Sequence, residues 1–156
     1  MSIHGFRWYD LGYDGSLQSV NNIVWAPNEP YHAECERLLG TSGYGDPELV
    51  THTAAEVPAI ECTCGCWAFN DPEDAWSLRE AWSVPRYRQG CKAFAAVEAW
   101  GGIVEHEHGF RAEFMEVRAV HVTRGVLHAC YTDVIRYNSL DALLAVWDTS
   151  FRSAVN

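Results

Sequence analysis

Hydrophobic side chains alternate with polar ones over several stretches of the chain, as in half-buried β-strands. Residues 3–9 and 17–25 are rich in β-branched and aromatic side chains and predict a hairpin. Residues 92–122 predict two or three further strands, and residues 125–137 continue with β-prone side chains. The expected turns contain glycine: Gly12 and Gly15, Gly101 and Gly102, and Gly109.

Other segments have apolar residues at helical spacing. We expect a helix at 29–39, with a proline near its start and a glycine just past its end, and a second at 72–82 behind a capping aspartate. A third helix follows a cap at Asn138 or Ser139. The apolar face of this last helix comprises Leu140, Leu143, Leu144, Trp147 and Phe151.

Length and composition predict a single folded unit. The chain has 156 residues, of which 48% are hydrophobic and 13% aromatic, and this is enough to bury a core. We therefore expect one globular domain over residues 1–156. Its predicted class is α+β, with a mostly antiparallel sheet and about three helices, including a C-terminal helix.

The net charge of −10 is concentrated in the first half of the chain. Residues 1–78 contain two basic and twelve acidic residues, whereas residues 79–156 contain nine of each. This distribution argues against nucleic-acid binding, which needs a basic surface. It is compatible with a basic protein partner, and equally with an acidic face that only interacts with water.

The sequence shows no targeting or membrane signal. The start lacks the basic and apolar regions of a secretion signal, and no apolar run approaches the roughly 18 residues of a membrane span. We therefore expect a cytoplasmic protein with reduced cysteines and no membrane partner. Disulfide bonding is the alternative, although a bridge within the cysteine cluster would be strained by its short loop.

Three of the six cysteines, Cys62, Cys64 and Cys66, alternate within five residues. Alternate residues of a strand point to the same side, so these thiols would share one face. Gly65 allows the chain to bend there, and Cys35 would project inward from the first helix. Zinc takes about four thiolate or imidazole ligands in a tetrahedron, so this group is a candidate structural zinc site.

Two other interpretations of the thiols stay open: unligated core residues and a reactive nucleophile. Cys66, Cys91 and Cys130 fit the core interpretation, since free cysteine is often buried. Imidazole ligands for a metal are available on the predicted strand around residue 106 and elsewhere. The candidates for the remaining ligand are His52, Cys91, His106 and His108.

The sequence contains no nucleotide-binding loop, hydrolase nucleophile motif or zinc-protease helix motif, so no catalytic residues are assigned. Arg111 and Glu113 would share one face of a strand. Pairing of Arg111 with Glu105 or Glu113 and an anion-binding role are both compatible with this position.

Two motifs carry a resemblance to a known group of proteins. They are C-x-C-G-x-x-A from Cys62 and W-G-x-x-V-x-H-x-x-G-F-R-A-E from Trp100. With Trp25, Pro27 and Cys35, they make the chain similar to small uncharacterised proteins of actinobacteria and their phages. The resemblance implies such an origin and no known activity. The residues that carry it and have metal-binding chemistry are Cys35, Cys62, Cys64 and His106, which suit one Cys₃His site.

These observations favour a small acidic interaction or regulatory protein of phage or prophage type that binds a bacterial host protein. One alternative is a small enzyme that uses a cysteine or a metal-bound water near Cys62, Cys64 and His106. Another is a DNA mimic, in which carboxylates imitate the spacing of phosphates and capture a DNA-binding protein.

Overall fold

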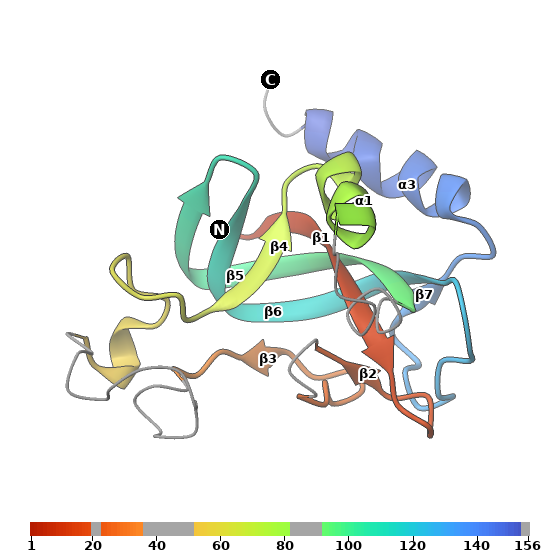
Figure 1. Ribbon diagram of the computed structural model, residues 1–156, viewed down its shortest axis with the longest axis horizontal. Coiled ribbons are helices and arrows are strands. Elements are labelled where there is room, and N and C mark those ends of the chain that lie inside the picture. The colour runs from red at the N-terminus through yellow and green to blue at the C-terminus, as the bar shows by residue number, and fades with distance from the viewer. Residues whose placement is uncertain (20–22, 36–51, 82–91, 154–156) are drawn as a thin grey trace.

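The computed structural model describes residues 1–19, 23–35, 52–81 and 92–153 (Figure 1). These residues form a mixed α/β structure that is mostly sheet. The strands are β1 (Ile3–Leu11), β2 (Leu17–Gln18), β3 (Tyr31–His32), β4 (Cys66–Phe69), β5 (Ala93–His106), β6 (Gly109–Val122) and β7 (Ile135–Arg136). The helices are a short 3₁₀ turn at Ala54–Glu56 and the α-helices α1 (Pro72–Ala81) and α3 (Leu140–Ser153).

The centre of the sheet is the long hairpin of β5 and β6, which turns at residues 107–108. Strand β1 pairs with β5, and β4 pairs with both β6 and β1, so β1, β5, β6 and β4 form a closed ring of pairings. All pairs are antiparallel except β6 with β7. The mixed class and the dominant sheet are therefore confirmed within the described ranges.

The helix expected at 29–39 is wrong over its described part, residues 29–35. Tyr31 and His32 instead form β3 and pair with Met115 and Phe114 of β6. The amide of Ala33 extends this pairing through a 2.7 Å hydrogen bond to Glu113. The edge of a neighbouring strand offers backbone partners that a short amphipathic pattern cannot reveal, so sheet pairing overrides local helical spacing. The rest of the expected helix lies outside the described residues.

The other two predicted helices are present. The carboxylate of Asp71 accepts a 2.7 Å hydrogen bond from the amide of Glu73 at the start of α1. The hydroxyl of Ser139 accepts one from the amide of Ala142, so Ser139 rather than Asn138 caps α3. Leu143 of α3 is fully buried. Among the described residues, two α-helices form rather than about three.

Two strand predictions differ from the structure. The strand region at 125–137 is shorter than expected, and the turn expected at Gly101 lies inside a continuous strand. Within residues 125–137 only β7 is a strand. Gly101 does not start a turn but lies at a bulge inside β5, with a φ of 80°. A bulge lets one long strand change direction, so residues 92–122 hold two strands of 14 residues each.

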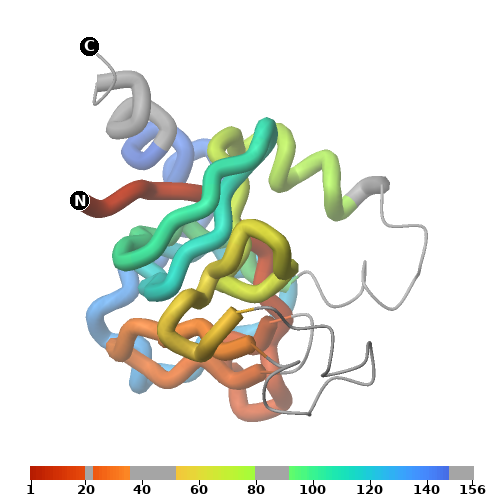
Figure 2. The backbone as a smooth tube through the Cα atoms, turned by 90° about the vertical axis from the view of Figure 1, so that its left-hand side faces the viewer, coloured from red at the N-terminus to blue at the C-terminus, as the bar shows by residue number. Residues whose placement is uncertain are grey.

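The sheet separates two apolar clusters of buried side chains. Helices α1 and α3 cover one face, where Phe6, Trp8, Phe94 and Leu143 form the smaller cluster. The larger cluster lies on the opposite face and includes the cysteines at positions 35, 62, 64 and 66. In Figure 2 the segment that leads into β4 lies beside the segment that ends at residue 35. The cysteines of the predicted site therefore come from neighbouring segments on the face opposite α1 and α3.

Candidate metal centre

Four potential metal ligands from three segments converge on the sheet face opposite α1 and α3: Cys35, His52, Cys62 and Cys64. Cys35 follows β3, His52 precedes the 3₁₀ turn, and the other two cysteines precede β4. Their four donor atoms all lie within 4.8 Å of one another. No disulfide joins the described cysteines, so these thiols are free to bind a metal.

Two of the distances between donor atoms fit a small tetrahedral ion. The Sγ atoms of Cys35 and Cys62 are 3.8 Å apart, and the Sγ of Cys64 is 3.7 Å from Nε2 of His52. A tetrahedral zinc ion with Zn–S bonds of about 2.3 Å places adjacent donors roughly 3.5–3.8 Å apart. The residues present therefore fit a tetrahedral metal without rearrangement of these two pairs.

His52 is oriented by a local backbone contact. Its Nδ1 lies 2.9 Å from the carbonyl oxygen of Thr53. A proton on Nδ1 that is donated to this carbonyl leaves the lone pair of Nε2 directed at the thiols, which is the tautomer a metal needs. Thr53 is fixed in turn by a capping box with Glu56, whose carboxylate accepts from the Thr53 amide at 2.7 Å.

Arg111 of β6 holds the loop that carries two of the cysteines. This side chain is only 2% exposed, and its Nη1 donates to the carbonyl oxygens of Ala59, Cys62 and Cys64. Its described hydrogen-bond partners are these carbonyls and His106. Pairing with Glu105 or Glu113, one of the two interpretations compatible with the sequence, does not occur among the described ion pairs. A buried guanidinium thus fixes the backbone between residues 59 and 64.

Glycine at position 65 lets the chain pass from this loop into β4. Gly65 has a φ of 112°, a conformation that side chains disfavour, and a Cβ there would lie 2.8 Å from the Cβ of Pro58. The expected strand through Cys62, Cys64 and Cys66 is therefore wrong, because β4 begins only at Cys66. The thiols at 62 and 64 converge through an irregular loop, whereas Cys66 packs in the core opposite Ala112.

The thiols differ in their readiness to ionise in the metal-free protein. Burial disfavours the Cys62 thiolate, but hydrogen bonds from His52, Cys64 and Cys35 outweigh it and lower the pKa of Cys62 to about 6. Burial, and to a smaller extent the neighbouring thiols, raise the pKa of Cys64 to about 11. Contacts with Thr53 and Cys62 raise the pKa of His52. One thiolate beside an imidazole is therefore present to attract a cation.

His106, the fourth ligand of the site predicted from sequence, lies outside the four-donor group. It is exposed, and its Nε2 accepts a 2.9 Å hydrogen bond from Nε of Arg111. Its ring stacks on Trp67 at 5.0 Å. The structure brings the three predicted cysteines together and supplies His52 as the imidazole. His52 was among the histidines considered, but its sequence context carries no signal that places it nearer the cysteines than His106.

Cys66, Cys130 and His108 are not members of the four-donor group. His108 contacts Asp74 at the start of α1, with 3.1 Å between Nδ1 and the carboxylate. The prediction that Cys130 is buried is wrong: it is exposed, and its Sγ lies 2.8 Å from Nδ1 of His128. Short coil segments around residue 130 leave it at the surface. Cys91 lies outside the described residues.

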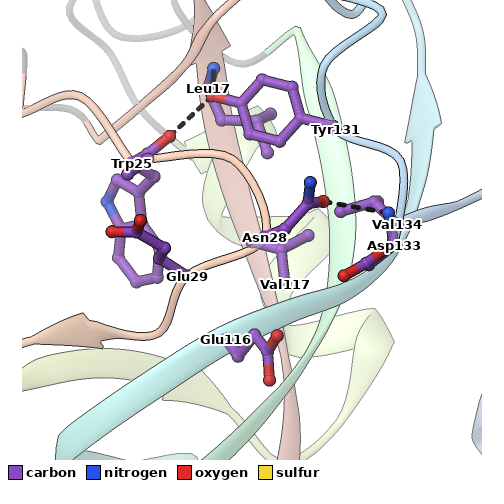
Figure 3. A pocket seen from close by; sticks show the side chains of 10 residues that line it. Leu17, Trp25, Asn28, Glu29, Glu116, Val117, Tyr131, Asp133 and Val134 are labelled. Atoms are coloured by element: carbon purple, nitrogen blue, oxygen red, sulfur yellow. Dashed lines mark hydrogen bonds between the residues drawn. The ribbon is translucent and has the colours of Figure 1, made fainter.

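A separate hollow lies between β6 and the segments around residues 25 and 131 (Figure 3). The hydroxyl of Tyr131 donates to the carbonyl of Trp25 at 2.6 Å and accepts from the amide of Leu17 at 2.8 Å. The carboxylates of Glu29, Glu116 and Asp133 also line it. None of its ten lining residues is a donor of the metal centre, so the thiols do not open into this hollow.

No family model matches the chain, and neither the curated proteins nor the solved structures contain a match. The likeness to actinobacterial and phage proteins therefore stays a prediction. No helix in the described part of the chain is long and apolar enough to cross a membrane.

Proposed function

We propose that this protein binds one zinc ion through Cys35, His52, Cys62 and Cys64, and that the ion is structural. The convergence of the four donor atoms within 4.8 Å carries the proposal. Soft thiolates with one imidazole in a tetrahedron favour zinc over magnesium or calcium, which prefer oxygen ligands. Bound zinc supplies a fixed cross-link between the three segments.

Four protein ligands make a closed site. A catalytic zinc site keeps an open position for water or substrate, whereas structural sites are filled by side chains. The three cysteines are 3–9% exposed, which leaves little access for a substrate. These features favour a structural role over the enzyme alternative, in which Cys62 or a metal-bound water would attack a substrate.

Arg111 supports the same proposal through charge. Three thiolates, one neutral imidazole and Zn²⁺ sum to a net charge of −1. A buried guanidinium that hydrogen-bonds the ligand loop offsets this charge, and no described carboxylate forms an ion pair with it. Among the described residues, the hydrogen-bond partners of this buried cation are carbonyl oxygens and the His106 imidazole.

Cobalt substitution tests the site. Tetrahedral thiolate coordination gives Co²⁺ strong visible d–d absorption and a near-ultraviolet charge-transfer band, and zinc displaces both. We expect saturation at one Co²⁺ per chain, with the charge-transfer band reduced in Cys64→Ser and unchanged in Cys66→Ser. Weak absorption typical of octahedral oxygen coordination would contradict the proposal.

We further propose that the zinc-stabilised fold serves as an interaction protein with a basic partner, which the phage-like resemblance would place among bacterial host proteins. Trp67 supports this role: it is 45% exposed, stacks on His106, and lies over the guanidinium of Arg111 at 5.3 Å. An exposed tryptophan on a rigid support is typical of a protein contact. The net charge of −10 favours a basic partner.

Affinity capture from a bacterial lysate at low and moderate salt tests this role, with the wild type and Trp67→Ser as baits. We expect a basic protein that binds the wild type, dissociates as salt rises and does not bind Trp67→Ser. Equal capture by both baits, or no capture at low salt, would count against it.

A further inference from the structure

We propose that Cys35 and Cys62 form a reversible disulfide on exposure to a hydroperoxide, and that this reaction expels the metal. The inference rests on the proposed zinc site and adds its regulation. The Sγ atoms of the two residues lie 3.8 Å apart within the four-donor group. A disulfide bond is about 2.05 Å long, so the two sulfur atoms need to move closer by about 1.8 Å.

The chain favours this pair over its neighbours. Cys62 and Cys64 are two residues apart, and a bridge between them would close a small, strained ring. Cys66 is the first residue of β4 and is buried in the core, where it pairs with Ala112 of β6 rather than belonging to the four-donor group. Cys35 and Cys62 come from two segments that already lie side by side, so only side-chain rotation and a small backbone shift are needed.

The proposed reaction balances in two steps. The Cys62 thiolate attacks one oxygen of the hydroperoxide, the O–O bond breaks, and Cys62 becomes a sulfenic acid. The Cys35 thiolate then attacks that sulfur, the S–S bond forms, and hydroxide leaves. The two thiolates lose two electrons to the hydroperoxide, and its oxygens leave, once protonated, as water, or as water and an alcohol.

Oxidation removes two of the four ligands, because a disulfide sulfur is a poor zinc ligand compared with a thiolate. His52 and Cys64 alone would hold zinc weakly. The disulfide replaces the metal as the link between the segments of Cys35 and Cys62, while Arg111 still holds the Cys62 and Cys64 carbonyls. The oxidised protein should therefore stay folded and rebind zinc after reduction.

The test uses full-length, zinc-loaded protein with Cys91→Ser and Cys130→Ser. Cys130 is exposed beside His128 and would otherwise react on its own, and Cys91 lies outside the described ranges. Hydrogen peroxide is added, zinc release is followed with a chromophoric chelator, and intact mass is measured. Trypsin then separates Cys35, in residues 8–37, from Cys62, Cys64 and Cys66, in residues 38–79. Fragment ions assign the bridge within the linked pair.

We expect zinc release together with a mass decrease of about 2 Da, a Cys35–Cys62 link, and recovery of zinc binding after reduction. Cys66→Ser in the same background should behave identically. Three results would overturn the proposal. They are retention of zinc with reduced thiols, a mass gain of about 32 Da from a sulfinic acid without a link, and a link to Cys64 or Cys66.

Failure of the zinc site is distinguishable from failure of the disulfide. Protein that never binds zinc refutes the proposed function and with it the expulsion of the metal. The same oxidation performed on metal-free protein still tests the Cys35–Cys62 pair directly.

Discussion

The Nη1 atom of Arg111 donates a hydrogen bond to the carbonyl oxygen of Cys64 at 2.9 Å, across 47 residues of sequence. The same atom donates to the carbonyls of Ala59 and Cys62, so one buried side chain of β6 fixes the loop that presents two of the proposed metal ligands. The position of the thiols therefore depends on the sheet as well as on the ligand loop.

Replacing Arg111 should weaken both the fold and the metal site. Arg111→Met leaves three carbonyls without their donor and should lower the free energy of unfolding of metal-free protein by about 3 kcal/mol. Zinc affinity should fall by about tenfold or more. Arg111→Lys keeps the charge but not the planar fork, so its losses should be smaller. Urea denaturation with chelator and competitive zinc titration measure the two effects.

The matched control is Arg118→Met. Arg118 pairs with Glu98 and Glu116 on a partly exposed face, so its loss should change stability by no more than about 1 kcal/mol. If Arg111→Met keeps the zinc affinity and the stability of the wild type, the guanidinium does not support the metal centre.

A pair of histidine variants separates His52, whose Nε2 lies within the four-donor group, from His106, the ligand predicted from the sequence. His52→Ala removes a zinc donor and should reduce affinity by more than ~100-fold, since even residues that only support the ligands affect it by 10–100-fold. His106→Gln keeps an acceptor for Arg111 and should change affinity by only a few fold, roughly. Competition against a chelator of known affinity measures both. The reverse order would assign the site to His106.

Zinc affinity should rise with pH. The pKa of Cys64 is raised to about 11, so this thiol carries a proton in metal-free protein at neutral pH and must lose it to bind zinc. The zinc-bound state therefore holds fewer protons, and each proton released makes affinity rise by about tenfold per pH unit. Cys62, with a pKa of about 6, adds to this slope mainly below that pH.

Competition titrations at several values of pH test this dependence, with the chelator calibrated separately at each one. An affinity that does not change with pH above neutrality would show that zinc displaces no thiol proton.

Gly65 should tolerate no side chain. Gly65→Ala combines a φ of 112° with close contacts to the Cβ atoms of Pro58 and Arg111, so the unfolding free energy should fall by more than about 2 kcal/mol. Gly125→Ala has a φ of 94° but its nearest contact is 3.3 Å away, at a leucine methyl, and should cost about 1 kcal/mol. Chemical denaturation compares the two, and equal losses would mean that crowding at position 65 is unimportant.

The sequence predicted the elements whose signals are local. Helix α1 follows a capping aspartate and α3 has a long apolar face, and both lie where expected. Strand β3 was missed because its stability comes from pairing with β6, which lies more than 80 residues away. Gly101 was expected to form a turn and instead forms a bulge, since glycine with positive φ serves either structure.

The candidate site shows the same division between local and distant information. The close spacing of Cys62, Cys64 and Cys66 in the sequence located the loop, and thiolates are typical zinc ligands. The choice between His52 and His106 depended on the fold: the β5–β6 hairpin directs His106 to Trp67 and Arg111, while the capping box beside His52 turns its ring toward the thiols. No spacing rule links His52 to the cysteines.

The most direct test is the zinc content of the purified protein. Elemental analysis of wild-type protein prepared without chelator should find about one zinc per chain, with little in Cys62→Ser and an undiminished amount in Cys66→Ser. Wild-type protein without zinc that also fails to take it up on addition would contradict the account.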